Sequence, residues 1–222
     1  MTDSAVCAAV QGCRFCTYLG GGAIAEIDTP WLHNSRYGAI VSKGALVPGW
    51  TLVCPRAHEL NLSGHYLLEE FWEFNSAAHE IVRCRYGEVR LFEHGVRSAG
   101  SPTGCGTDHA HMHMVPLDFS LVDEAQQFND SLVWRTCHLA DVSTRSAGKE
   151  YLFVADHFQG QYTTGAICLL DSPISQFFRK VIASRLGMST LSDYRQHPML
   201  NNGAVSAIDL MVDASRGNRV GA

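Results

Sequence analysis

Three histidines alternate with apolar residues in the run His109-Ala110-His111-Met112-His113-Met114-Val115-Pro116. Residues two apart in a strand share one face, so the three imidazoles are predicted to point one way. Ala110, Met112 and Met114 then point the other way, into a core. An unpaired buried imidazole costs free energy, and packing does not call for three of them in a row. The run therefore indicates a site that surrounds a metal, a phosphate or both; the alternative is a solvated strand face that happens to carry histidines.

The central histidine, His111, is the candidate nucleophile. Imidazole is a good nucleophile near neutral pH when one nitrogen stays deprotonated, and a hydrogen bond from the other nitrogen to a backbone carbonyl sets that tautomer. Phosphoryl chemistry also needs donors around the non-bridging oxygens. His113 can supply one, although a packed strand histidine is its other interpretation. The loop Gly104-Cys105-Gly106-Thr107 can supply backbone N–H groups, because glycines permit close approach.

Two thiols stand at the spacing of a metal knuckle in Cys13-Arg14-Phe15-Cys16. A tetrahedral zinc site needs two further ligands, and these must be lone Cys or His residues because there is no second Cys-x-x-Cys. Reduced thiols in a turn are the alternative. The other cysteines are scattered, which favours a cytosolic protein with buried thiols over a disulfide framework.

Hydrophobic periodicity predicts the elements that must position these residues. Strands are predicted over 36–42, 50–55 and 89–92, with the histidine strand after a Gly/Ser/Pro-rich loop over 95–106. A long helix is predicted from about 64 to 85, ending at Gly87, with acidic residues early and arginines late. The order predicts an α+β fold: an antiparallel sheet with one long helix packed across it.

The second half of the chain is predicted to add a C-terminal α/β elaboration. A short helix is predicted over 124–133, strands over 151–155 and 166–170, and an apolar segment over 206–212. A further helix is predicted to pack on the core, with Ser172 as N-cap and Pro173 at its first position, ending at Gly187. We expect one structural unit, a core over 1–120 and an extension over 121–222, with a loose lead-in over 1–12 and a disordered tail beyond about 215.

Composition narrows the class of protein. The chain has 222 residues, of which 46% are hydrophobic and 18% charged, so a globular protein is expected. A net charge of −5 argues against binding a nucleic-acid polymer. The apolar runs are too short to span a bilayer, and the residues after Met1 lack the basic region of a secretory signal. A cytoplasmic location without membrane attachment is therefore expected.

The triad run resembles the His-x-His-x-His-x-x pattern of the histidine triad superfamily, whose members handle nucleotides. Residues 49–58, Gly-Trp-Thr-Leu-Val-Cys-Pro-Arg-Ala-His, resemble the family's Gly-x-x-Leu-Val-x-Pro-x-x-His segment. The Cys-x-x-Cys at Cys13 and Cys16 is similar to the one that opens the zinc-containing branch. The resemblance covers about residues 10–120, and the extension beyond it is not recognised.

This resemblance implies a structural zinc ion held by Cys13, Cys16, His58 and His109. It also implies that His111 Nε2 attacks the α-phosphorus of a nucleotide or nucleotide conjugate to form a covalent nucleotidyl-histidine. His65 is a competing metal ligand, interpreted instead as a cap of the long helix. A homodimer through the long helix and an edge strand is implied as well, unless the extension caps that edge within one chain.

The chain departs from the family pattern around the phosphate. Glu93-His94-Gly95 stands where many members have Asn-Glu-Gly, and Cys105 and Gly106 stand where a Gln or Ser is common. A glutamate there would repel phosphate unless His94 or an arginine offsets it. His94 is therefore a candidate compensating donor or a proton donor to the leaving group, and a purely structural Glu93–His94 pair is the alternative. The identity of the substrate stays open.

Further candidates lie outside the motifs. The nucleoside pocket is expected between the first two strands and the long helix, where Trp31, Leu32, His33 and Tyr37 could line it or could simply be core. Four cationic residues of the extension could contact a second substrate moiety: Arg179, Lys180, Arg185 and Arg195. A solvated helix face is the better interpretation of the first three.

The predicted function is a nucleotide hydrolase or nucleotidyltransferase acting through His111. A nucleotidyl transferase or phosphorylase with a phosphate or sugar-phosphate acceptor, for which the extension could build the site, is the first alternative. A non-catalytic nucleotide-binding protein is the second.

Overall fold

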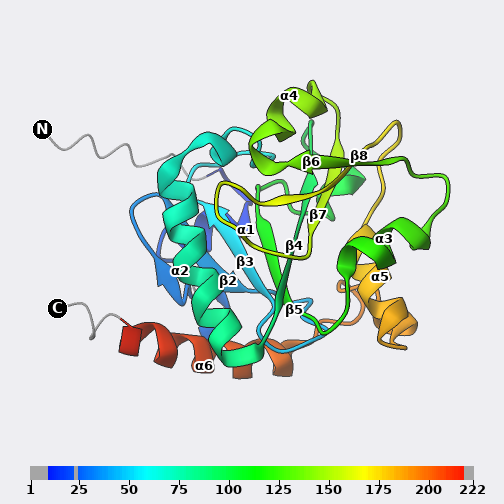
Figure 1. Ribbon diagram of the computed structural model, residues 1–222. Coiled ribbons are helices and arrows are strands. Elements are labelled where there is room, and N and C mark those ends of the chain that lie inside the picture. Colours follow the sequence, from blue (N-terminus) through cyan, green and yellow to red (C-terminus); the bar gives the residue numbers. More distant parts are fainter. Residues whose placement is uncertain (1–9, 23–24, 218–222) are drawn as a thin grey trace, which may run out of the picture.

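One antiparallel sheet of eight strands runs through the molecule, in the order β1-β2-β3-β5-β4-β7-β8-β6 (Figure 1). The computed structural model describes residues 10–22 and 25–217. The strands are β1 (Leu32–His33), β2 (Tyr37–Val41), β3 (Thr51–Pro55), β4 (Val89–Gly95), β5 (Met112–Pro116), β6 (Trp134–His138), β7 (Tyr151–Ala155) and β8 (Thr164–Leu169). Every pair of neighbouring strands is antiparallel.

Helices cover both faces of this sheet. They are α1 (Arg14–Leu19), α2 (Glu69–Tyr86), α3 (Leu121–Phe128), α4 (Val142–Ser146), α5 (Phe177–Arg185) and α6 (Leu200–Gly217). Figure 1 shows α2 lying across the sheet, and α3 close to α5, where Glu124 and Arg185 form an ion pair at 2.9 Å. None of the helices within the described ranges is both long and apolar enough to cross a membrane.

Two separate apolar cores result from the alternation of side chains along the strands. Leu91, Met112 and Met114 face the core that α2 and α6 cover. Phe92 and Val115, their neighbours in sequence, face the core that α1, α3 and α5 cover. The predicted direction of Ala110, Met112 and Met114 into a core is thereby confirmed, because all three lie in the cluster under α2.

The predicted fold class is confirmed: the protein is α+β, with an antiparallel sheet and a long helix packed across it. Two boundaries differ near the site. The long helix begins at Glu69 and not at 64, because residues 65–67 form a separate 3₁₀ turn and Leu68 is extended. The regular strand of the triad run begins only at Met112, so His109 and His111 lie in the segment that leads into β5.

Three elements predicted for the extension have other boundaries in the structure. The helix predicted over 124–133 is α3, which begins at 121 because the Ser120 hydroxyl and the Asp156 carboxylate accept from its first N–H groups. Ser172 and Pro173 do not begin α5; the N–H groups of Ile174 and Gln176 bond instead to Thr103 Oγ1 and Cys105 Sγ, and the helix starts at 177.

The third concerns the C-terminus. The apolar segment predicted over 206–212 is the middle of the 18-residue helix α6, in which Ala207 and Leu210 are buried but Ile208 and Val212 are exposed. The helix continues to Gly217, close to the predicted start of the tail. Residues 218–222, and residues 1–9 of the predicted lead-in, lie outside the described residues. The strand β6 was not predicted at all.

The extension continues the sheet of the first half. Strand β7 pairs with β4, so β4 is internal and the ends of the sheet are β1 and β6. This is the arrangement in which the extension caps an edge within one chain. The division into a core and an extension at residue 120 stays a prediction. The homodimer through the long helix and an edge strand also stays a prediction.

Candidate functional site

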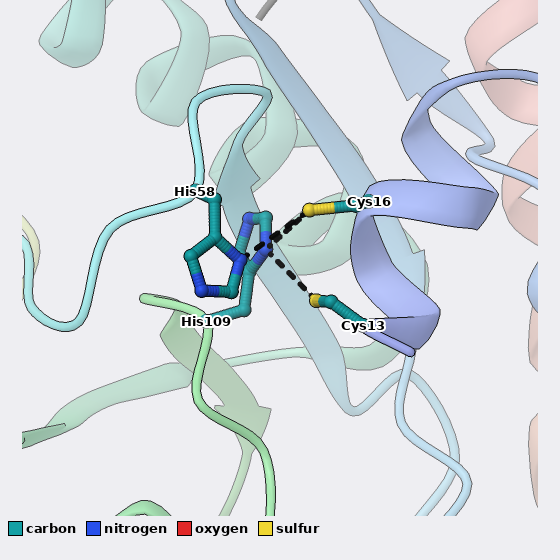
Figure 2. Close-up of side chains that lie close together, drawn as sticks. All are labelled: Cys13, Cys16, His58 and His109. Atoms are coloured by element: carbon teal, nitrogen blue, oxygen red, sulfur yellow. Dashed lines mark hydrogen bonds between the residues drawn. The ribbon is translucent and has the colours of Figure 1, made fainter. Parts of the chain in front are cut away.

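Four side chains gather where α1 meets the ends of β3 and β5, and Figure 2 shows them facing one another. The Sγ atoms of Cys13 and Cys16 and one nitrogen each of His58 and His109 all lie within 4.8 Å of one another. Cys13 Sγ is 3.4 Å from His109 Nδ1, and Cys16 Sγ is 3.4 Å from His58 Nδ1. In a tetrahedral site with Zn–S of about 2.3 Å and Zn–N of about 2.05 Å, sulfur and nitrogen are about 3.6 Å apart. This cluster therefore has the donor set and the spacing to hold a metal ion.

The second nitrogen of His109 supports this assignment. His109 Nε2 donates to the Pro55 carbonyl at 2.8 Å, which leaves Nδ1 unprotonated and aimed at the two thiols. A ligating histidine almost always donates its other N–H to such an acceptor. His65 is not part of the cluster and does not cap α2; it bonds to the Tyr37 hydroxyl at 2.9 Å and lies 3.1 Å from a Glu59 oxygen.

His111 is held in the tautomer that nucleophilic attack requires. Its Nδ1 donates to the backbone carbonyl of His109 at 2.8 Å, because a carbonyl can only accept, and Nε2 keeps its lone pair. The ring of Phe15 meets the imidazole edge-on, with centroids 5.5 Å apart. Burial lowers the pKa of His111 to about 4, so the ring is neutral at pH 7.

His113 is held in the opposite tautomer. Trp50 Nε1 donates to His113 Nδ1 at 2.9 Å, and since an indole N–H can only donate, the proton of His113 sits on Nε2. Phe92 stacks on the imidazole, with centroids 4.0 Å apart and planes at 15°. Burial lowers the pKa of His113 well below its usual value. The ring centroids of His111 and His113 are 4.6 Å apart. His111 presents a lone pair at Nε2, and His113 presents an N–H at Nε2.

Both imidazoles line one cavity that opens to solvent. Six of the predicted site residues contribute to it: His94, Gly104, Cys105, Thr107, His111 and His113. Gly106 does not line the cavity; its backbone has φ +80°, and the exposed Arg195 side chain lies beside it.

Three backbone N–H groups of the glycine loop already have carbonyl acceptors, so they are not free to hold a phosphate. Residues 102–104 form a 3₁₀ turn, in which Gly104 N–H donates to Ser101, Cys105 N–H to Pro102 and Thr107 N–H to Gly104. The predicted cradle of backbone N–H groups is therefore wrong for these three residues. The sequence suggested an open glycine loop, whereas the turn consumes the donors itself.

Glu93 does not face the cavity, so the prediction that it contacts substrate is wrong. Neighbours on a strand point to opposite faces, and His94 and Glu93 do so. Glu93 is 1% exposed and accepts hydrogen bonds from Leu62 N–H at 2.7 Å, from the Tyr151 hydroxyl at 2.6 Å and from the Tyr66 hydroxyl. Burial raises its pKa to about 7 in spite of these three donors. Glu93 is therefore a structural group that neither repels a phosphate nor is offset by His94.

The raised pKa of Glu93 makes stability depend on pH. Between the ordinary value of 4.5 and about 7, the folded protein holds a proton that the unfolded chain has lost, so stability falls as pH rises. The free energy of unfolding of the wild type should fall between pH 5 and pH 8. In Glu93→Gln we expect this fall to be smaller by roughly 3 kcal/mol, since one pKa unit is worth about 1.36 kcal/mol. Urea unfolding at both pH values measures it.

A matched variant for this test is Glu88→Gln, which removes an exposed carboxylate next to the same strand. It should leave the pH dependence as in the wild type. If the free energy of unfolding depended on pH equally in Glu93→Gln and in the wild type, the Glu93 carboxyl would have the same pKa in the folded and unfolded states.

Trp31 and His33 also lie away from this cavity. Trp31 is 5% exposed in the core under α2, and His33 is exposed on the edge strand β1. For Trp31 the alternative interpretation, a core aromatic, is the one that the structure supports.

Sequence reasoning missed two cations at this cavity, Arg14 and Lys43, and named the third, Arg179, as a candidate contact to a second substrate moiety. Arg14 stands between Cys13 and Cys16, and its position inside the knuckle was a signal that could have been used. The interpretation of Arg179 as part of a solvated helix face is wrong, because its side chain is 5% exposed. Lys180 is exposed, in keeping with that interpretation, and Arg185 pairs with Glu124 at the surface.

His94 lines the cavity from β4, and its buried Nε2 has no hydrogen-bond partner among the described residues. Burial lowers its pKa to about 3. At neutral pH it therefore carries no charge, so it is better suited to donate or accept a hydrogen bond than to give up a proton as an acid.

Comparisons with solved structures found proteins of the histidine triad (HIT) family. A hypothetical histidine triad nucleotide-binding protein from Sulfolobus tokodaii is 22% identical, with 49% of this chain and 71% of that chain covered and a TM-score of 0.39. A Hit-like protein involved in cell-cycle regulation from Bartonella henselae is 16% identical, with coverages of 49% and 82% and a TM-score of 0.37. A HIT family hydrolase from Clostridium thermocellum is 20% identical, with coverages of 50% and 96% and a TM-score of 0.35.

No protein-family model matches this chain, and no curated protein matches it. TM-scores below 0.5 are too low to transfer a residue's role or an activity from these proteins.

Proposed function

We propose that this protein cleaves a nucleotide or nucleotide conjugate at its α-phosphate, as a hydrolase or nucleotidyltransferase, with His111 as the nucleophile. One observation carries the proposal. The hydrogen bond from His111 Nδ1 to the His109 carbonyl leaves an unprotonated Nε2 in a cavity that is also lined by N–H donors and cations.

The reaction has two displacements at one phosphorus. In the first, the lone pair of His111 Nε2 forms an N–P bond, the bond from phosphorus to the leaving group breaks, and the leaving atom takes the electron pair and, where it is too basic to leave as an anion, a proton from water. In the second, the oxygen of water or of an acceptor attacks the same phosphorus and loses its proton. The N–P bond then breaks and its electron pair returns to Nε2.

His113 stabilises the charge on the phosphoryl oxygens in this proposal. Its Nε2–H is on the same face as His111, and the tautomer is set by Trp50. Because the ring is neutral and buried, it can only donate a hydrogen bond, without supplying a proton. His94 and the cavity cations are the further groups that can face phosphate oxygens.

His113→Ala is expected to lower kcat by about 10²- to 10³-fold, which is the usual cost of one lost oxyanion donor. Steady-state kinetics on a nucleotide that the wild type turns over measures it. Trp50→Phe keeps an aromatic ring at this position but removes the N–H that orients His113, so a smaller loss of kcat, of order tenfold, is expected. If both variants kept the wild-type kcat, His113 would have no role in catalysis.

The metal that we propose is a structural zinc ion bound by Cys13, Cys16, His58 and His109. Two thiolates and two imidazoles suit zinc, and four protein ligands leave no open position for substrate. When bound, zinc would clamp the segment 13–16 to the ends of β3 and β5. It would also fix His109, whose side chain is a ligand and whose carbonyl holds His111. The proposed role is therefore to position the nucleophile.

The proposal is tested by trapping the intermediate. The protein is mixed with a nucleotide labelled at its α-phosphate, quenched in base, and analysed for label bound to the chain by mass spectrometry. Label on the peptide that contains His111 supports the mechanism. Absence of label together with tight nucleotide binding and no turnover would favour the non-catalytic alternative.

Product analysis separates the two enzyme classes. Release of a nucleoside monophosphate in water alone indicates a hydrolase. A product that requires inorganic phosphate or a sugar phosphate indicates the transferase or phosphorylase, for which the extension β6–α6 would supply part of the acceptor site.

A further inference from the structure

Arg179 reaches from the extension into the cavity that holds His111. It belongs to α5, and its side chain is 5% exposed. Two of its nitrogens are used: Nε donates to the Ser192 carbonyl and Nη2 to the Leu191 carbonyl, each at 2.8 Å. The third nitrogen, Nη1, is buried and has no hydrogen-bond partner among the described residues. The guanidinium is thus fixed on one side and unsatisfied on the other.

A second guanidinium lies at the same cavity in a similar state. Arg14 stacks over the rings of Phe15 and Tyr194, at 4.9 and 5.9 Å from their centroids, and its Nη2 donates to Thr107 Oγ1 at 3.3 Å. Its Nε is buried and has no partner within the described parts of the chain. Arginine stays charged in a protein, so these are two charged donors without acceptors.

The cavity itself offers no acid to these two charges, although Asp193 interacts electrostatically with Arg179 from outside the lining. The residues that line the cavity include no aspartate and no glutamate. The third cation there, Lys43, is already paired with Asp28 at 2.8 Å. Burying an unsatisfied charged donor costs free energy, and an anion that accepts from both arginines would recover it. Guanidinium groups bind the oxygens of phosphates especially well.

We propose that Arg179 and Arg14 form an anion subsite beside His111, which binds a phosphate group next to the phosphorus that His111 attacks. The inference rests on the proposed function and narrows its substrate class to nucleotides with a phosphoanhydride bond at the α-phosphate. The same chemistry would hold inorganic phosphate as an acceptor. The extension contributes Arg179 and the N-terminal segment contributes Arg14, and together they supply donors that the bonded N–H groups of Gly104, Cys105 and Thr107 do not offer.

Two further features agree with this assignment. Burial lowers the pKa of Arg179 to about 10, which still leaves the group charged at neutral pH. Gly44 faces the same nitrogen, because a Cβ added there would lie 2.8 Å from Arg179 Nη1 and 2.9 Å from Tyr194 Cβ. Any side chain at position 44 would therefore displace Nη1 from its place in the cavity.

Binding of inorganic pyrophosphate to the metal-loaded protein tests the subsite without turnover. Calorimetry should give a Kd about 10- to 100-fold weaker for Arg179→Gln than for the wild type, as expected for a lost charge-assisted hydrogen bond. Gly44→Ala should weaken binding similarly while keeping the arginine, and it decides the test if Arg179→Gln fails to fold. Arg185→Gln, which removes an exposed cation from the same helix, should bind as the wild type does.

Turnover separates this proposal from the proposed function. The kcat/KM of Arg179→Gln should fall about 10- to 100-fold for a nucleoside diphosphate but not for a nucleoside phosphoramidate, whose leaving group is an amine. Equal losses on both, or none, would overturn the subsite and leave the His111 mechanism standing. Arginine-dependent pyrophosphate binding with no turnover of either nucleotide would instead retain the subsite and reject the proposed function.

The same assays distinguish whether the phosphate group in the subsite belongs to the leaving group or to an acceptor. If the subsite holds the leaving group, added inorganic phosphate competes with the nucleoside diphosphate. If it holds an acceptor, inorganic phosphate accelerates turnover and appears in the product. Wild-type protein that does not bind pyrophosphate at millimolar concentration would overturn the proposal.

Discussion

His111→Gly is expected to abolish turnover, with kcat lowered by about 10⁴-fold or more, as is usual when a nucleophile is removed. His111 is the histidine of the triad run that is free to attack. His109 Nδ1 faces the two thiols, and Trp50 holds His113 with its proton on the nitrogen that could otherwise react. Single-turnover kinetics with a labelled nucleotide measures both the rate and the loss of the covalent adduct.

Fold and metal content are the controls for this variant. Circular dichroism and metal analysis of His111→Gly should match the wild type, because the one hydrogen bond of the His111 side chain within the described residues goes to a backbone carbonyl. Added imidazole should restore part of the activity by occupying the space of the missing ring. His138→Ala, a variant of an exposed histidine on β6, should keep full activity. Turnover of His111→Gly at the wild-type rate would reject the covalent mechanism and leave the triad run as a metal site alone.

The second large effect is expected at the metal cluster. The purified protein should contain about one zinc ion per chain, the number for one closed four-ligand site. Cys13→Ser should lose the metal and much of the stability, because a bound metal stabilises only the folded state. At free zinc about a thousandfold above Kd, that contribution is about 4 kcal/mol. Inductively coupled plasma mass spectrometry and thermal unfolding with and without a chelator measure the two losses.

Cys84→Ser is the matched control for this experiment. Cys84 is an exposed thiol on α2 that bonds to Glu80, outside the cluster, so its loss should change neither zinc nor stability. His109→Ala should behave as Cys13→Ser does and act through stability. Full zinc content in purified Cys13→Ser would overturn the assignment of the ligands.

Local periodicity was enough to predict the central elements. The strand period of two placed His111 and His113 on one face and Ala110, Met112 and Met114 on the other, and the structure confirms this. The helix period predicted α2 to within a few residues. Both predictions depend on contacts between neighbours in sequence, so no distant residue was needed.

Predictions that depended on loops were less successful. Ser101, Pro102 and Gly104 use their own carbonyls to close the turn before the triad run, and a glycine-rich sequence does not reveal that. The start of α5 was misplaced for a related reason. The N–H groups of Ile174 and Gln176 are bound by residues about 70 positions away, so Ser172 is not needed as a cap.

By itself, the sequence indicated the character of the site: a face of imidazoles, two thiols at the spacing of a metal site and an α+β frame to carry them. Tertiary structure alone decided which charges surround it. Glu93 turned away because Tyr66, Tyr151 and Leu62 satisfy it on the opposite face. Arg179 turned inward because the carbonyls of residues 191 and 192 hold two of its nitrogens. A charged side chain is buried only where distant partners compensate its desolvation, and partners brought together by folding leave no periodic signal in the sequence.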